Sequence, residues 1–334
     1  MVKKILIIVM AMFLSIISFE LFLRYSPFSY GVSPVLYDKD IGMWHKKNFS
    51  SYAIKECYNT KYFFDENGLV DINYIYNDER KDVLILGDSF TEAIMVKNKN
   101  ILHNSLWKEF KGKYNFLNYG LSGTSPTQQY MILVKKANLN NVKTILQIIN
   151  IDSDLYDVDP KNIDSFSRPK VAIKFISVED YFIIPPRKQG LKDKIIDIIG
   201  SYQIYVPLKK SIYFLKKEVK KFISNNKIKE KKTIGKKMVN LAQNWLQIEG
   251  AIYQTKKLLK SKGIEYIVII NSEKKDNIEQ LVKILHRYSI PFLNLYDLTS
   301  HHILTLPSFS CDKHWNDEAH INLAKYIFKS GIIK

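Results

Sequence analysis

Five short runs of Ile, Val and Leu, separated by helix-like segments, constrain the fold of this chain more than any other feature. The runs are almost continuously apolar, whereas a strand with one face in water would alternate apolar and polar residues. The pattern therefore predicts an α/β protein with a mostly parallel sheet that helices cover on both faces. The expected strands are residues 83–87, 114–120, 142–150, 263–272 and 291–298.

After an N-terminal segment, the chain divides into a lead-in segment and the α/β domain, and the domain contains an insertion. Residues 26–80 mix aromatic, Asn and Asp residues with short alternating runs, which predicts a lead-in segment of loops and short strands packed on the core. Residues 81–334 would form the α/β domain. At about 160–237 the repeated pattern breaks, and a Lys-rich, helical insertion is expected there.

An apolar stretch near the N-terminus, residues 5–23, contains a single charge, Glu20. It is long enough to cross a bilayer as a helix. A cleaved signal peptide is the alternative, but its apolar core is usually shorter and ends at a small-residue cleavage site, which is missing here. We therefore expect residues 1–25 to form an uncleaved, single-pass signal-anchor. Lys3 and Lys4 favour an N-terminus inside the cell, which places the remaining chain outside the cytoplasm.

The charge balance is strongly basic, with 50 Lys and Arg against 33 Asp and Glu, a formal net charge of +17. Such an excess indicates either an anionic neighbour or simply a lysine-rich composition. Many of the lysines lie in residues 209–237, where apolar residues fall near helical spacing. This stretch predicts a solvated surface helix, a helix on a membrane surface, or a contact with an acidic glycan. No nucleic-acid-binding motif accompanies the lysines, so nucleic acid is not an expected partner.

The sequence Gly-Asp-Ser-Phe at residues 87–90 directly follows the first expected core strand. Ligands of α/β sheets bind beyond the carboxyl ends of the strands. A serine at a strand-to-helix turn, here Ser89, therefore has the position of a catalytic nucleophile. The alternative is a helix N-cap, in which Asp88 or Ser89 opens the helix and Glu92 completes a capping box three residues after Ser89.

A serine nucleophile needs a base and a group that orients the base. His314 lies after the last expected strand and before the last expected helix, so it belongs to the same edge of the sheet as Ser89. Asp312 lies two residues earlier and could hold its imidazole. The sequence therefore predicts a Ser89–His314–Asp312 triad.

Three blocks in this order, GDSF, NYGLSG and DKHWN, resemble the blocks of the SGNH (GDSL-like) hydrolase superfamily. The resemblance covers residues 82 to about 330. An anchor and lead-in before GDSFTEA also look like bacterial envelope members that act on cell-surface glycans. The resemblance implies a three-layer α/β/α fold and acyl-ester chemistry without a metal or another cofactor. It makes Ser89 the nucleophile, His314 the general base and Asp312 its orienting group, with the amides of Ser89 and Gly123 in the oxyanion hole.

The sequence departs from this superfamily in two places. Asp312 and His314 are two positions apart, where the commonest terminal block has a separation of three. The oxyanion Asn that normally follows the third strand is also displaced, because QIINIDSDLYD offers only Asn150, while alignment brings Asp152 or Ser153 near the slot. A carboxylate there would oppose the developing negative charge, so we expect either Asn150 or a hole built mostly from backbone amides.

The function expected from these residues is that of a serine esterase or O-acyltransferase for acetyl groups, acting through an acyl-Ser89 intermediate. Hydrolysis and transfer use the same triad, so the sequence leaves both open. An anchored enzyme that faces outward would meet a cell-surface polysaccharide or a lipid-linked glycan ester. The alternative is a catalytically silent member that binds glycan or scaffolds an envelope complex.

Two cysteines, Cys57 and Cys311, are the only ones in the chain. They lack the spacing of metal ligands. Outside the cytoplasm they would be able to form one disulfide, and unpaired buried thiols are the alternative.

Overall fold

The computed structural model describes residues 2–25, 31–159, 169–208, 211–212, 215–216 and 241–334. The chain forms two compact units. One unit comprises residues 1–33 and 189–238, and the other comprises residues 34–188 and 239–334. The division of the chain at residues 25 and 80 stays a prediction.

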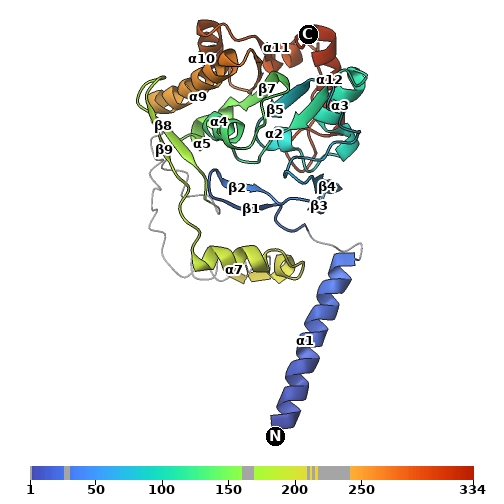
Figure 1. The fold of residues 1–334 in the computed structure, drawn as a ribbon. Coiled ribbons are helices and arrows are strands. Elements are labelled where there is room, and N and C mark those ends of the chain that lie inside the picture. The colour runs from blue at the N-terminus through green and yellow to red at the C-terminus, as the bar shows by residue number, and fades with distance from the viewer. Residues whose placement is uncertain (1, 26–30, 160–168, 209–210, 213–214, 217–240) are drawn as a thin grey trace, which may run out of the picture. The chain divides into compact units, whose positions relative to one another are not determined.

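Five parallel strands form the central sheet of the second unit, in the order β11-β10-β7-β5-β6 (Figure 1). Every neighbouring pair in this order runs parallel. This arrangement confirms the five-stranded, mostly parallel sheet that the apolar runs predict. The strands are β5 (Asp82–Leu86), β6 (Asn115–Asn118), β7 (Val142–Asn150), β10 (Glu265–Asn271) and β11 (Phe292–Asn294).

Helices cover both faces of the sheet, which gives the domain its three layers. Alternate residues of β5 show the division, because Leu84 and Leu86 pack into one core while Val83 and Ile85 pack into the other. A strand buried on both faces needs no polar alternation, which explains the continuous apolar runs. The first core takes side chains from α4 (Pro126–Lys135), α5 (Ile151–Asp157), α9 (Leu241–Ser261) and α10 (Lys275–Arg287), and the second from α3 (Leu102–Glu109) and α12 (Asp317–Ser330).

The fifth strand is shorter than the predicted 291–298. β11 ends at Asn294, whose side-chain oxygen accepts a hydrogen bond from the amide of Tyr296. This cap starts a short helix, α11 (Leu295–Ser300). A side-chain cap at an Asn therefore turns the second half of the expected strand into helix.

The lead-in segment forms two antiparallel hairpins before the sheet. Tyr62 and Phe64 of the second hairpin pack with Ala93 and Met95, which follow the first core strand. The hairpins therefore contact the sequence that contains Ser89. Their strands are β1 (Val35–Asp38) with β2 (Gly42–His45), and β3 (Phe49–Lys55) with β4 (Tyr58–Phe64).

The predicted insertion at about 160–237 is only partly helical where the structure describes it. It contains a hairpin, β8 (Ala172–Phe175) with β9 (Tyr181–Ile184), and a helix, α7 (Leu191–Ile199). Most of residues 209–237, where the lysines gather, lies outside the described residues, so the basic helix expected there stays a prediction.

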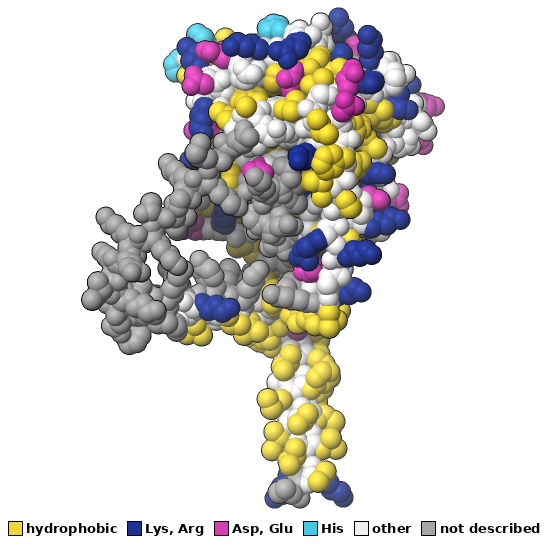
Figure 2. Space-filling view, turned by 90° about the vertical axis from the view of Figure 1, so that its left-hand side faces the viewer, with side chains coloured by type: hydrophobic (Ala, Val, Ile, Leu, Met, Phe, Trp, Pro, Cys, Tyr) yellow, Lys and Arg dark blue, Asp and Glu magenta, His cyan; other side chains and the backbone are white. Residues whose placement is uncertain are grey.

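The N-terminal helix α1 (Val2–Tyr25) is long and apolar enough to cross a membrane. Its mean hydropathy is 2.6, and only 6% of its most apolar window is buried inside the protein. Figure 2 shows apolar side chains along its length and lysines at its N-terminal end.

Candidate active site

The turn after β5 places Ser89 at the start of α2 (Ser89–Glu92), a single helical turn. Asp88, not Ser89, caps this turn, because its carboxylate accepts a hydrogen bond of 2.9 Å from the amide of Phe90. Gly87 is required before it, since a Cβ atom at this position would lie 1.9 Å from Thr91 Oγ1. The hydroxyl of Ser89 is therefore free of the capping role that the sequence left open for it.

Ser89, His314 and Asp312 form one hydrogen-bonded chain. His314 Nε2 lies 2.7 Å from Ser89 Oγ, and His314 Nδ1 is hydrogen-bonded to Asp312 Oδ1. The amide of His314 also donates to Asp312 Oδ1, at 3.1 Å. The structure thus brings together the three residues of the predicted triad, although 225 positions separate the serine from the histidine.

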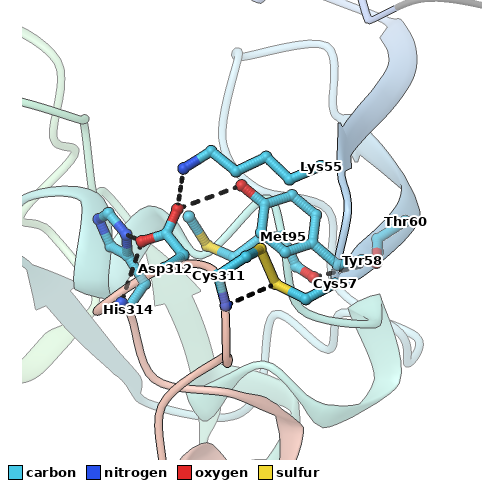
Figure 3. The surroundings of a disulfide bond; sticks show 8 residues. All are labelled: Lys55, Cys57, Tyr58, Thr60, Met95, Cys311, Asp312 and His314. Atoms are coloured by element: carbon cyan, nitrogen blue, oxygen red, sulfur yellow. Dashed lines mark hydrogen bonds and ion pairs between the residues drawn. A yellow bond between two sulfur atoms is a disulfide. The ribbon is translucent and has the colours of Figure 1, made fainter.

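The second carboxylate oxygen of Asp312 is bound by the β3–β4 hairpin (Figure 3). Lys55 Nζ donates to Asp312 Oδ2, and Tyr58 Oη lies 3.4 Å from the same oxygen. Burial raises the pKa of Asp312, but the hydrogen bonds from Lys55 and His314 outweigh it and hold that pKa well below its usual value. Asp312 is therefore an anion throughout the neutral pH range. Nothing in the local sequence around Lys55 or Tyr58 predicts these contacts.

A disulfide between Cys57 and Cys311 fastens the same two segments together (Figure 3). Cys57 lies in the turn of the β3–β4 hairpin, and Cys311 directly precedes Asp312. Their Cα atoms are 5.7 Å apart. The triad loop is thus held covalently and electrostatically by a hairpin from the lead-in segment.

The loop that contains Gly123 lies against the strand end before Ser89. The amide of Leu121 donates to the carbonyl of Gly87 at 3.1 Å, and Thr124 Oγ1 contacts the same carbonyl at 3.2 Å. Gly123 itself has a φ of +71°, a left-handed conformation that favours glycine. Its carbonyl accepts a hydrogen bond from the buried Lys170.

A second buried hydrogen-bond network, centred on Glu92 at the end of α2, holds the loop that contains Gly123. Glu92 Oε2 accepts hydrogen bonds from the amide of Ser122, at 3.1 Å, and from its hydroxyl. Glu92 Oε1 lies 2.7 Å from His45 Nε2, and His45 Nδ1 donates to the carbonyl of Gly68. Glu92 therefore does not close the capping box that was the alternative interpretation of the sequence. It joins α2, the Gly123 loop and the lead-in segment instead.

Three residues are candidates for the side chain that would complete the oxyanion hole, and each has different hydrogen-bond partners. Asn150 ends β7, and its side chain lies close enough to Asp88 to lower the pKa of that carboxyl. Asp152 points toward the β10–α10 turn, where it accepts hydrogen bonds from Ser272 and Asn277. The hydroxyl of Ser153 donates to the carbonyl of Asn150 at 3.1 Å. Of these three side chains, Asn150 is therefore the one that acts on Asp88, the residue before Ser89.

Several acidic groups are buried close behind this turn. Burial raises the pKa of Asp88 to about 6, against the hydrogen bonds from the Phe90 amide and the Asn150 side chain. Burial also raises the pKa of Asp154 well above its usual value, and the like charge of Asp88 adds to this effect. The charge of the buried Lys170 lowers the pKa of Asp154, while burial lowers the pKa of Lys170 to about 8 against the charges of Asp157 and Asp154. Lys170 thus compensates a cluster of acids while it holds the Gly123 carbonyl.

Comparison with known proteins finds only distant similarity. No protein-family model matches the sequence, and no curated protein matches it. Among solved structures, the chain is similar to a lipolytic protein of the G-D-S-L family from Desulfitobacterium hafniense, with a TM-score of 0.40 and 10% identity over 76% of this chain and all of the other. It is also similar to a GDSL-like lipase from Bacteroides thetaiotaomicron, with a TM-score of 0.38 and 11% identity over 77% of this chain and 92% of the other.

A third similar structure is a catalytic mutant of an acetylxylan esterase from Geobacillus stearothermophilus, with a TM-score of 0.39 and 11% identity over 76% of this chain and 95% of the other. At this distance the likeness says nothing about chemistry, which has to follow from the side chains of this chain.

A cavity of about 810 Å³ opens beside the triad, at the carboxyl ends of β7, β10 and β11. Phe90 and Trp315, the sequence neighbours of Ser89 and His314, form one part of its wall. Most other lining groups are polar, and they include Asn150, Ser153, Asn271, Tyr296 and Thr299. Aromatic faces beside hydroxyl and amide groups suit a ligand that is rich in hydroxyls and has apolar patches.

Within the described residues, no group of three or more His, Cys, Asp or Glu side chains is arranged to hold a metal ion.

Proposed function

We propose that the protein is a serine esterase or O-acyltransferase that works through an acyl-Ser89 intermediate. The observation that carries this proposal is the continuous hydrogen-bonded chain from Ser89 Oγ through His314 to the anionic Asp312. Such a chain activates a hydroxyl that is otherwise a weak nucleophile.

In this proposal each residue has one role. His314 Nε2 takes the proton of Ser89 as Oγ attacks the ester carbonyl, and Asp312 stabilises the imidazolium that forms. The amides of Ser89 and Gly123 and the side chain of Asn150 would bind the oxyanion of the tetrahedral intermediate. His314 then gives the proton to the leaving alcohol, which departs as the acyl-Ser89 ester remains.

The second half of the reaction needs a hydroxyl to accept the acyl group. His314 removes a proton from water or from a sugar hydroxyl, whose oxygen attacks the acyl-Ser89 carbonyl. The bond from that carbonyl to Ser89 Oγ then breaks, and His314 returns the proton to Ser89 Oγ. Water makes the protein an esterase, and a sugar makes it an acyltransferase. Both use the same groups.

The substrate that we propose is an acetyl ester on a polysaccharide or lipid-linked glycan of the cell envelope. The polar and aromatic lining of the cavity beside the triad supports a carbohydrate. The apolar helix α1 supports a single-pass anchor. The Cys57–Cys311 disulfide and the two lysines before the span support a catalytic domain outside the cytoplasm, because disulfides persist in oxidising compartments.

The proposal is tested with the full chain in detergent, a fluorophosphonate probe and p-nitrophenyl acetate. Labelling and acetate release should fall by about 10⁴-fold or more in Ser89→Ala and in His314→Ala, because the triad acts as a unit. Ser300→Ala and His301→Ala, which change exposed residues of the same types, should leave both activities unchanged. A folded protein that shows neither labelling nor turnover would point instead to a silent glycan-binding protein.

A further inference from the structure

The unit that contains α1 carries an uncovered apolar surface on α7. Leu191, Ile195 and Ile198 are 76%, 44% and 63% exposed and follow the i, i+4, i+7 spacing of one helix face. Asp193 and Asp197 lie on the other side, where they accept hydrogen bonds from the Gly190 amide and the Gln189 side chain. The described part of α7 is therefore amphipathic, and its apolar face lies opposite the face that carries Asp193 and Asp197.

A buried carboxylate joins the segment after α7 to the apolar helix α1. Glu20 Oε1 accepts a hydrogen bond from the amide of Gln203, and Glu20 Oε2 accepts one from the amide of Ile204, each at 3.0 Å. Glu20 and Gln203 are 8% and 7% exposed. The one charged residue within the apolar stretch is thus used to fix the chain just beyond α7.

The position of Glu20 along α1 sets the depth of this junction. The apolar stretch of residues 5–23 would be about 28 Å long as a helix, close to the thickness of a bilayer's hydrocarbon core of about 30 Å. Glu20 lies three residues before the end of that stretch, or about 4.5 Å along the axis. The junction therefore lies near the boundary between acyl chains and headgroups. In Figure 1, α7 runs across the direction of α1 and not along it.

We propose that α7 lies in the plane of the membrane surface, with Leu191, Ile195 and Ile198 buried at the boundary of acyl chains and headgroups. The partner is the lipid surface itself. Glu20 connects α1 to the segment directly after α7. If α1 spans the membrane, lipid surrounds it, and the same lipid lies within reach of the exposed apolar face of α7. The twelve lysines of residues 209–237 follow in the chain, and they would attract anionic headgroups.

This inference rests on the membrane-spanning role proposed for α1, and the experiment separates the two. Full chains with one added cysteine are labelled with a nitroxide while the native disulfide stays oxidised, and are placed in nanodiscs of phosphatidylcholine and phosphatidylglycerol. Collision with lipid-soluble oxygen and with a water-soluble nickel chelate then reports depth. The positions are Leu14→Cys in α1, Ile198→Cys on the apolar face of α7 and Asp193→Cys on its other face.

We expect oxygen to reach the labels at Leu14 and Ile198, and nickel to reach the label at Asp193. The Ile198 label should lie about 5–10 Å into the boundary region. A label at Leu14 in lipid with equal nickel access at Ile198 and Asp193 would overturn the inference and leave the span intact. Shielding of Ile198 from both reagents would also overturn it, because protein would then cover the face. A Leu14 label in water would overturn the span itself.

The anchoring role of Glu20 is tested by Glu20→Leu, which keeps α1 apolar. The Leu14 label should stay in lipid, whereas the Ile198 label should move toward water and lose its fixed depth. An unchanged Ile198 profile in Glu20→Leu would overturn the assignment of Glu20 as the anchor of α7.

Discussion

Replacing both Cys57 and Cys311 by alanine should destabilise the catalytic domain and weaken its activity. The disulfide joins two segments that are separated by 254 positions. In the chain-entropy treatment of cross-links, closing a loop of this length restricts the unfolded chain by about 5.5 kcal/mol at 25 °C. Measured losses on removing native disulfides are usually about 2–5 kcal/mol, and we expect a value in that range.

The position of the disulfide predicts that activity falls together with stability. Cys311 directly precedes Asp312, and Lys55 reaches Asp312 from the hairpin that carries Cys57. Without the covalent link, the hairpin and the triad loop are held mainly by hydrogen bonds and by packing between Tyr58 and Phe309. We therefore expect kcat for p-nitrophenyl acetate to fall in the double variant at temperatures where it is still folded.

The measurement is thermal unfolding of the full chain in one detergent, with and without a reductant. A loss of about 2–5 kcal/mol corresponds to a fall in Tm of about 4–10 °C for a domain of about 250 residues. The reductant should lower the Tm of the wild type and leave that of the double variant unchanged. A Tm within about 2 °C of the wild type, with thiol titration showing the wild-type disulfide intact, would refute this reasoning.

Three further variants test single contacts of the site. Lys55→Met should lower Tm at pH 7, and the difference in Tm from wild type should vanish as pH falls well below 3.8. The reason is that the pKa of Asp312 is lower in the folded state than in the unfolded state. The stability that the Asp312 carboxylate contributes is therefore present above its unfolded pKa and is lost as the carboxylate is protonated. Glu92→Ala should lower kcat by about 10–100-fold with KM nearly unchanged, because a methyl group cannot accept the two hydrogen bonds of Ser122 and the Gly123 loop would shift. A change in KM alone would contradict this role. Gly250→Ala should cost about 1–3 kcal/mol in denaturant unfolding, because its Cβ would lie 2.3 Å from a buried phenylalanine ring; an unchanged midpoint would contradict this packing.

Local sequence signals were enough for most of the sheet and for the placement of Ser89. Continuous apolar runs predict strands buried on both faces because each strand reports its own burial through its own residues. Where a local signal competes with another, the prediction was wrong in detail. The cap at Asn294 ended the fifth strand early, so the predicted strand 291–298 extended four residues too far.

Local sequence patterns did not predict the contacts around the triad, because the two residues of each contact lie far apart along the chain. Lys55 meets Asp312 across 257 positions, and Glu92 meets His45 across 47. A lone lysine in a short strand, or a glutamate near a serine, has no periodicity that marks such a partner. The one signal that could have pointed to the hairpin was the pair of cysteines, and two cysteines alone leave bonded and unbonded states equally open.

The sequence by itself therefore determined the layered architecture, the apolar N-terminal helix and the edge of the sheet at which Ser89, Asp312 and His314 meet. Only the tertiary structure decided that a hairpin of the lead-in segment binds the carboxylate of Asp312 and that the Asn150 side chain lies next to Asp88. It also decided that Glu20 links α1 to the segment after α7. The physical reason is that burial periodicity is written into each element, whereas a specific hydrogen bond depends on how distant elements are brought together by the packing of the whole chain.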